Sequence, residues 1–405
     1  MSTDVPTLDD HPSTPSRSEY EGRLRRVRIA MAKNSLATLI VTDPANLFYL
    51  TGYNAWSFYT PQCLVVPESG DIVFFARAMD AAGAPSTAPT LAPANVEGYP
   101  EALVHRADIH PYEWITERIR ERGLVSPDHG DVVGIEGDSQ YFPARGLWAL
   151  EKGLRGATLE DSRELVNWAR VIKSDFELQR MRIAGTIAQS AMQAALAGVR
   201  PGRRQCDVAA EIVAAQTAGT VAHGGDYPSM VPMMPTGARG KAPHLSWTDQ
   251  RFVSGEVTMI ELAGVYDRYN VPVARTVMLG DPPQGMRHME SVVRDGMAAV
   301  LEAIRPGQIS SDIHSVWDSV IRSNGLSKES RLGYSIGIGY PPDWGERTFS
   351  IRAEDETVLR EGMCFHIVTW MWKDGNGYMQ SEPVTVTADG VERLTDLTAG
   401  LTVNE

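Results

Sequence analysis

The chain has 405 residues, of which 43% are hydrophobic and 22% charged, a composition typical of a soluble globular protein. Its length exceeds what one ordinary core accommodates and predicts two domains. The 38 basic residues are outnumbered by 51 acidic ones, and the formal net charge of −13 argues against a nucleic-acid or anionic-membrane partner. No apolar run approaches the roughly 20 residues that a membrane span needs.

Residues 1–16 are polar, acidic and rich in proline. They lack the apolar stretch of a secretory signal, and we expect them to form a flexible arm. Cys63, Cys206 and Cys364 are an odd number and form no Cys-x-x-Cys pair. Neither a disulfide framework nor a zinc knuckle is therefore indicated, and a cytoplasmic location fits best.

Helix and strand signals alternate through residues 17–165, which predicts an α/β domain. Ser18 stands three residues before Glu21, the capping-box spacing that begins an amphipathic helix. Continuous apolar runs then predict buried strands. These strands are expected at 36–42, 62–67, 71–77 and 131–137, with a helix at 113–123.

The pattern changes in the second domain, residues 166–405. Ser174 and Glu177 have capping-box spacing and predict a long helix that ends near residue 197. The DGNG sequence at 374–377 predicts a hairpin turn between two strands. Further helices are expected at 205–218, 284–304 and 310–324. Helices and strands that alternate irregularly predict an α+β domain.

Four segments of the second domain carry side chains suited to catalysis. They are GARGKAPHLSW with His244, MIELAGVYDRYNVPVARTV with Glu261 and Arg275, RLGYSIGIGYPPDWGERT with Tyr334, Asp343 and Glu346, and EGMCFHIVTW followed by MQSEPVTVTADG with Glu382. Together with the junction RVIKSDFELQRMR, their order and spacing resemble the creatinase/aminopeptidase superfamily, the pitta-bread hydrolases. The resemblance implies a catalytic pitta-bread domain and a homodimer.

Metal-dependent members of that superfamily hold two metal ions with two Asp, one His and two Glu. Aligned on the Arg275-Thr276 pair, the five positions read Glu261, Pro272, Tyr334, Val368 and Glu382. Two carboxylates cannot hold a metal pair, so we expect neither metal nor cofactor. Buried carboxylates then need another cation. A planar amidinium or guanidinium substrate supplies one, because its paired N–H groups match a carboxylate.

Two loops add candidate substrate-binding residues. Between residues 52 and 62 the aromatic side chains are spaced as in a loop, and such faces can enclose a delocalised cation. These aromatic residues are Tyr53, Trp56, Phe58 and Tyr59. The HGGDY loop contributes His223 and Asp226, for which a substrate contact, a helix cap and a dimer contact all remain open.

The segments SFYTPQC, HGGDYPSMVPMMPTGARGKAPHLSW, IELAGVYDRY and GYPPDWGERTFS resemble one branch of the superfamily, the ectoine hydrolases of bacterial ectoine catabolism. The resemblance implies hydrolysis of a cyclic amidine that also bears a carboxylate. The implied product is an N-acetyl-2,4-diaminobutyrate, with the Nα isomer favoured. 5-Hydroxyectoine is a second candidate substrate.

The residues suggest a division of roles. Glu261 attacks the amidine carbon or orients a water, Glu382 holds the positive charge, and His244 moves the proton, as the histidine at its position does in creatinase. The other candidates bind substrate or water: Tyr334, Asp343, Glu346 and, for the carboxylate, Arg275 or a neighbouring donor. Two alternatives stay open, a guanidine hydrolase of the creatinase type and a binding module without catalysis.

Overall fold

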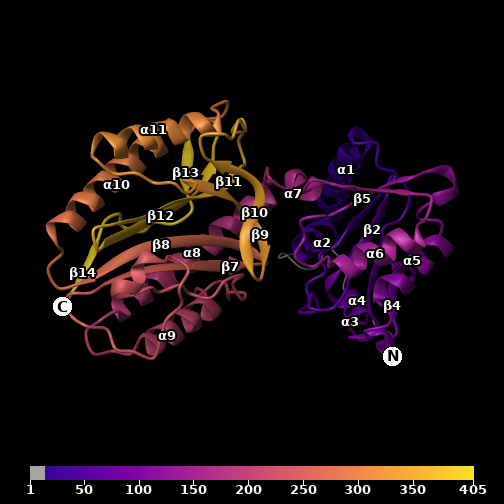
Figure 1. The fold of residues 1–405 in the computed structure, drawn as a ribbon, viewed down its shortest axis with the longest axis horizontal. Helices are drawn as coiled ribbons and strands as arrows, with labels where there is room; N and C mark the ends of the chain where they lie inside the picture. Colours follow the sequence, from indigo (N-terminus) through magenta and orange to yellow (C-terminus); the bar gives the residue numbers. More distant parts are fainter. Residues whose placement is uncertain (1–13) are drawn as a thin grey trace. The chain divides into compact units, whose positions relative to one another are not determined.

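The computed structural model describes residues 14–405, so almost all of the arm predicted at 1–16 lies outside the described residues. The chain divides into two compact units, the first ending at Arg170 and the second spanning Val171–Glu405. Figure 1 shows the helices and strands of each unit. Between residues 14 and 405, none of the helices is long and apolar enough to cross a membrane.

The first unit is built on a six-stranded sheet in which parallel and antiparallel neighbours are mixed. Its strands, in spatial order, are β4 (Val96–Tyr99), β3 (Val73–Arg77), β2 (Cys63–Pro67), β1 (Thr38–Val41), β5 (Val132–Ile135) and β6 (Thr158–Asp161). Its helices are α1 (Arg17–Lys33), α2 (Pro44–Thr51), α3 (Ala78–Ala81), α4 (Ala84–Thr87), α5 (Pro111–Glu121), α6 (Ala144–Gly153) and α7 (Leu165–Ala169). Ile115 of α5 and Leu150 of α6 share a buried apolar cluster with Ile40 and Val133 of the sheet.

The first helix begins two residues earlier than predicted. Its N-cap is Ser16, whose side chain accepts a hydrogen bond from the Glu19 N–H, and not Ser18. The sequence contains two overlapping Ser-x-x-Glu patterns, Ser16 to Glu19 and Ser18 to Glu21. Spacing alone does not choose between them, because both satisfy the capping-box rule.

The second unit holds an eight-stranded sheet with long, strongly paired hairpins. Its strands are β7 (Val257–Tyr266), β8 (Tyr269–Leu279), β9 (Gly333–Tyr340), β10 (Asp343–Ile351), β11 (Cys364–Lys373), β12 (Asn376–Val386), β13 (Val391–Arg393) and β14 (Thr402–Asn404). The spatial order is β13-β12-β11-β9-β8-β14, with β10 beside β9 and β7 beside β8. Its helices are α8 (Asp175–Gly198), α9 (Gln205–Ala218), α10 (Gln284–Ala303) and α11 (Ser310–Ser323).

The local predictions for this unit are confirmed. Ser174 and Glu177 form the capping box of α8, and α9, α10 and α11 lie where helices were expected. The turn of the β11–β12 hairpin is Asp374-Gly375, and both residues have positive φ, as a two-residue type I′ turn requires. In the β7–β8 hairpin, Asp267 and Arg268 take the same left-handed conformation although neither is glycine.

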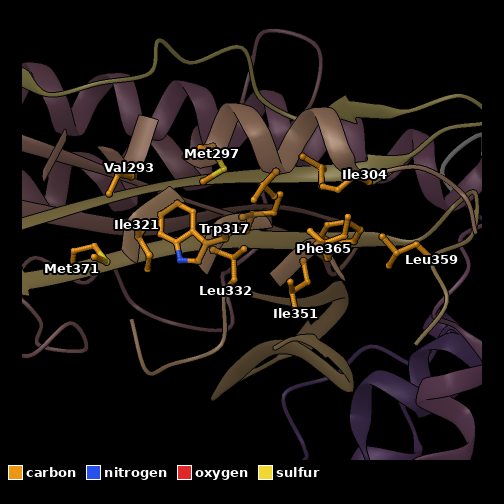
Figure 2. Close-up of a cluster of buried hydrophobic side chains, with 14 of the residues drawn as sticks. Val293, Met297, Ile304, Trp317, Ile321, Leu332, Ile351, Leu359, Phe365 and Met371 are labelled. Atoms are coloured by element: carbon orange, nitrogen blue, oxygen red, sulfur yellow. The ribbon is translucent and has the colours of Figure 1, made fainter. Parts of the chain in front are cut away.

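Helices cover one face of the strands that carry the candidate residues. Phe365 and Ile367 of β11 and Val384 of β12 join Trp317 of α11 and Val293 of α10 in a large buried cluster (Figure 2). Gly264 of β7 lies so close to α8 that a side chain there would collide with the helix backbone. Successive strand residues point to opposite faces, so the residues between these positions in the sequence face the other side.

Candidate active site

Three hairpins bring the candidate residues onto the face that the helices leave uncovered. Glu261 pairs with Ala274 across β7 and β8, and His366 pairs with Tyr334 across β11 and β9. Directly opposed side chains share a face of a sheet. Ser381 joins these strands, because its Oγ accepts the Ala274 N–H at 2.6 Å and lies 2.6 Å from His366 Nε2. We call the surface that carries Glu261, Tyr334, His366 and Ser381 the site face.

A hydrogen-bonded chain crosses the site face with His366 at its centre. The His366 Nδ1 atom lies 3.0 Å from the Tyr334 hydroxyl, which also accepts the Trp344 Nε1–H at 2.8 Å. The Glu261 Oε1 atom lies 3.9 Å from the same Nδ1. The histidine ring is thus held on both nitrogens, with a carboxylate just beyond hydrogen-bond range.

Burial governs the protonation of this group. Removal from water raises the pKa of Glu261 to about 7, because burial disfavours a charged carboxylate. The same desolvation, assisted by the positive charges of Arg331 and Arg275, lowers the pKa of His366 to about 3. The His366 ring is therefore neutral at physiological pH, and its contact with Glu261 is not an ion pair.

The surroundings of Glu261 explain its desolvation. Its strand neighbours include Met233, whose backbone bonds to that of Glu261 on the outer side of β7. Two small apolar clusters lie on the site face, one with Met233, Ala263 and Trp344, the other with Met259, Ala274 and Met379. Partly exposed side chains pack against them: Tyr334, Val368, Trp370 and Trp372.

Glu382 is not on the site face, and its predicted role needs correction. As the neighbour of Ser381 on β12 it points to the opposite side, where Oε1 accepts from Arg275 Nη2 at 2.9 Å and Oε2 from Arg393 Nε at 3.0 Å. Arg275 itself is buried and donates its remaining N–H groups to backbone carbonyls, among them those of Ser381 and Thr398. Both residues are occupied by structure, so Glu382 does not hold a substrate cation and Arg275 does not bind its carboxylate.

Glu346 also has an internal partner. Its Oε2 accepts from Lys173 Nζ at 2.6 Å, and both side chains are fully buried, so the predicted substrate contact is replaced by a structural ion pair. Asp343 is half-buried and accepts the Gly345 N–H at 2.8 Å. Its negative charge raises the pKa of Tyr334, which places Asp343 near the site. Tyr334 lies on the site face, as expected of a substrate-binding residue.

His244 lies in an exposed turn. It comes two residues before Ser246, which pairs with Met233 and so lies one strand position beyond the neighbour of Glu261. His366, which the sequence interpretation did not select, occupies the place beside Glu261 that was expected for His244. A signal was available: His366 precedes Val368 by two residues and therefore shares its face of the strand.

The HGGDY loop lies at the tip of the β7–β8 hairpin. The His223 ring packs edge-on against Tyr266 at 5.2 Å, and the Asp226 carboxylate lies 3.4 Å from Arg268 Nη1. The backbone N–H of Asp226 bonds to Val265, four residues along the strand from Glu261, or roughly 13 Å. This placement supports a role in fixing the hairpin tip more directly than a substrate contact.

The predicted aromatic loop follows α2 in the first unit and has no regular structure. Trp56 and Tyr59 are exposed at 57% and 58%, and Trp56 packs against Phe58 with ring centres 4.9 Å apart. Tyr53 differs, because it is buried against Phe74 and its hydroxyl bonds to Ser57. The first three can present aromatic faces to a ligand, whereas Tyr53 is a core residue of this unit.

The site face does not suit a pair of metal ions. Of the positions that align with metal ligands, Pro272 and Val368 offer no donor, and Ser381 rather than Glu382 faces the site. Within residues 14–405, no three His, Cys, Asp or Glu side chains gather where they could share a metal ion. Glu261 is the one carboxylate left among these positions.

Comparison with protein families agrees with this architecture. Residues 179–388 match the metallopeptidase family M24, and residues 23–172 match the creatinase/prolidase N-terminal domain. The chain belongs to family M24 and carries the creatinase-type N-terminal domain. The predicted class, a hydrolase acting on carbon–nitrogen bonds, is thereby confirmed.

Among curated relatives, the ectoine hydrolase of Halomonas elongata is 40% identical over 388 residues, which is 94% of this chain and 96% of that protein. An uncharacterized hydrolase/peptidase of Sinorhizobium fredii, y4tM, is also 40% identical, over 96% and 98% of the two chains. The resemblance to ectoine hydrolases is therefore confirmed, and it extends over nearly the whole length of both chains.

Solved structures with the same fold include dipeptidase PepE from Mycobacterium ulcerans, with a TM-score of 0.79, 23% identity and coverage of 96% and 99% of the two chains. The prolidase from Pyrococcus horikoshii has a TM-score of 0.77, 20% identity and coverage of 93% and 99%. At these identities the likeness concerns the fold alone. It confirms the predicted α/β N-terminal domain followed by an α+β pitta-bread domain.

Proposed function

We propose that this protein hydrolyses the cyclic amidine ring of ectoine without a metal ion. The observation that carries the proposal is a desolvated carboxylate, Glu261, with which no lysine or arginine of the described chain forms an ion pair. A buried carboxylate is stabilised by a cation with matching N–H donors, and the ectoine amidinium is such a cation. The 40% identity to the ectoine hydrolase of Halomonas elongata supports the same substrate.

The proposed reaction consumes one water and breaks one ring C–N bond. Glu261 adds to the amidine carbon, or orients a water that does so, and the C=N electron pair moves onto nitrogen. Proton transfer to the departing nitrogen then releases it as an amine. In the covalent route, water attacks the same carbon and frees Glu261. The product is an N-acetyl-2,4-diaminobutyrate, and we favour the Nα isomer.

Proton transfer falls most naturally to the chain of Tyr334, His366 and Ser381. A neutral imidazole passes protons between its two nitrogens without forming a stable cation, and both nitrogens of His366 already contact hydroxyl groups. His244 is retained as a second candidate. Asp343 and the exposed aromatic residues Trp56, Phe58 and Tyr59 are candidates for holding the substrate.

The test is to incubate the purified protein with ectoine and identify the product by mass spectrometry and NMR. An acetylated diaminobutyrate supports the proposal, and the same assay with 5-hydroxyectoine defines the substrate range. Release of urea from creatine, without action on ectoine, would favour a guanidine hydrolase. Ectoine binding without turnover would favour a binding module. Loss of activity with a chelator, restored by a divalent metal, would contradict metal independence. We also propose a cytoplasmic homodimer, which light scattering and cell fractionation test.

A further inference from the structure

The carboxylate of the proposed substrate requires a cation, and Arg275 is not available for it. We propose that Arg331 binds this carboxylate while Glu261 holds the amidinium. This inference rests on the proposed function. It extends that function by naming a second anchor of opposite charge on the same face of the sheet.

Arg331 lies on the site face. It stands just before β9, with its guanidinium carbon 4.3 Å from the centre of the Tyr334 ring. Its Nη1–H donates to Ser350 Oγ at 3.2 Å. Ser350 pairs directly with Tyr334 across β10 and β9, so both side chains share one face. A guanidinium that contacts both must lie on that face.

Arg331 also differs from the arginines that surround it. Arg275 and Arg393 are paired with Glu382, and Arg268 is paired with Asp226. Across the described chain, no carboxylate forms an ion pair with Arg331, and the side chain is exposed. One N–H bonds to Ser350 and the others remain for a ligand, in the planar fork that suits a carboxylate.

The two proposed anchors act on the same intermediate residue. The negative charge of Glu261 raises the pKa of Tyr334, whereas the positive charge of Arg331 lowers it, although burial has the largest effect. Tyr334 therefore lies within electrostatic range of both. A zwitterionic ring that lies along Tyr334 would place its amidinium near Glu261 and its carboxylate near Arg331. A cyclic amidine without the carboxylate would use only the first anchor.

The experiment compares ectoine with 2-methyl-1,4,5,6-tetrahydropyrimidine, the same ring without its carboxylate, in the full-length wild type and in Arg331→Met. We expect Arg331→Met to lower kcat/KM for ectoine by about 10- to 100-fold, mainly through KM, as for loss of a hydrogen bond to a charged group. The carboxylate-free ring should be turned over equally well by both proteins. If that ring is not opened, its competitive inhibition constant should be equal in both.

Arg322→Met is the matched control, because it removes the same charge from an exposed position on α11. It should leave both substrates unaffected. Equal ectoine turnover by Arg331→Met and wild type would overturn the inference. Equal losses for both substrates in a variant with the wild-type unfolding temperature would do so as well. If the wild type opened neither ring, the proposed function itself would fail.

Discussion

Glu261 and His366 are buried side by side, with 3.9 Å between Oε1 and Nδ1, and burial shifts their pKa values in opposite directions. The carboxyl group moves toward its protonated form and the imidazole stays neutral, so the free site carries little charge. An amidinium beside Glu261 would favour the carboxylate again. Substrate binding would thus itself generate the nucleophilic form of Glu261.

The first prediction concerns Glu261→Gln. The amide cannot attack the amidine carbon or accept a proton from water, so kcat should fall by about 10³-fold or more. Turnover in ¹⁸O-labelled water separates the two routes. Label in the Glu261 carboxylate after several turnovers supports direct attack, and unlabelled Glu261 would leave the activated water. Wild-type activity in Glu261→Gln would remove this residue from the mechanism.

The second prediction is the pH dependence of the reaction. With the pKa of Glu261 near 7 in the free enzyme, the reactive carboxylate is the minor form below that pH. The value of kcat/KM for ectoine should therefore rise tenfold per pH unit below about 7 and level off above it. A profile that is flat from pH 5 to 8 would contradict a titrating Glu261. His366, with its pKa near 3, should add no limb in this range.

The third prediction is that Glu261 reduces stability at high pH. Its folded-state pKa lies above the ordinary value of 4.5, so its favourable contribution is complete below pH 4.5 and is lost as pH rises through 7. Glu261→Gln should therefore be more stable than wild type at pH 8, by up to about 3 kcal/mol. At pH 4 the two should unfold at similar urea concentrations. A constant difference across this range would indicate an effect unrelated to titration.

The fourth prediction separates the two histidines. His366→Asn breaks the contacts with Tyr334 and Ser381 and should lower kcat by about 10²- to 10⁴-fold, the range for loss of a general acid or base. His244→Asn changes an exposed turn and should cost less. Measuring kcat for both variants decides between the residues. A larger loss for His244 would restore the role that the sequence suggested for it.

The sequence predicted what local rules determine. The cap at Ser174, the turn at Asp374-Gly375 and the helices of the second unit follow from spacing and turn chemistry that act over a few residues. Glu261 was found because its strand and the Arg275-Thr276 pair fix one register. The fold class followed from motif order.

The errors arose where one residue of register or a loop conformation decides. Ser381 and Glu382 are adjacent, and a shift of one position exchanges the site face for the helix-covered face. The sequence contains a carboxylate at one position and a hydroxyl at the other, and the carboxylate was chosen. His366 was overlooked within an apolar strand. His244 lies in a turn, whose conformation hydrophobic periodicity does not determine.

The last prediction tests the corrected role of Glu382. Removing its charge leaves Arg275 buried without compensation, which costs about 3–5 kcal/mol for a buried pair. Glu382→Gln should therefore unfold at clearly lower urea concentration, while the folded protein keeps a kcat close to that of the wild type. Glu392→Gln is the control, because Glu392 pairs with exposed Arg182 and should contribute less than about 1 kcal/mol. Wild-type stability together with lost turnover would return Glu382 to the substrate.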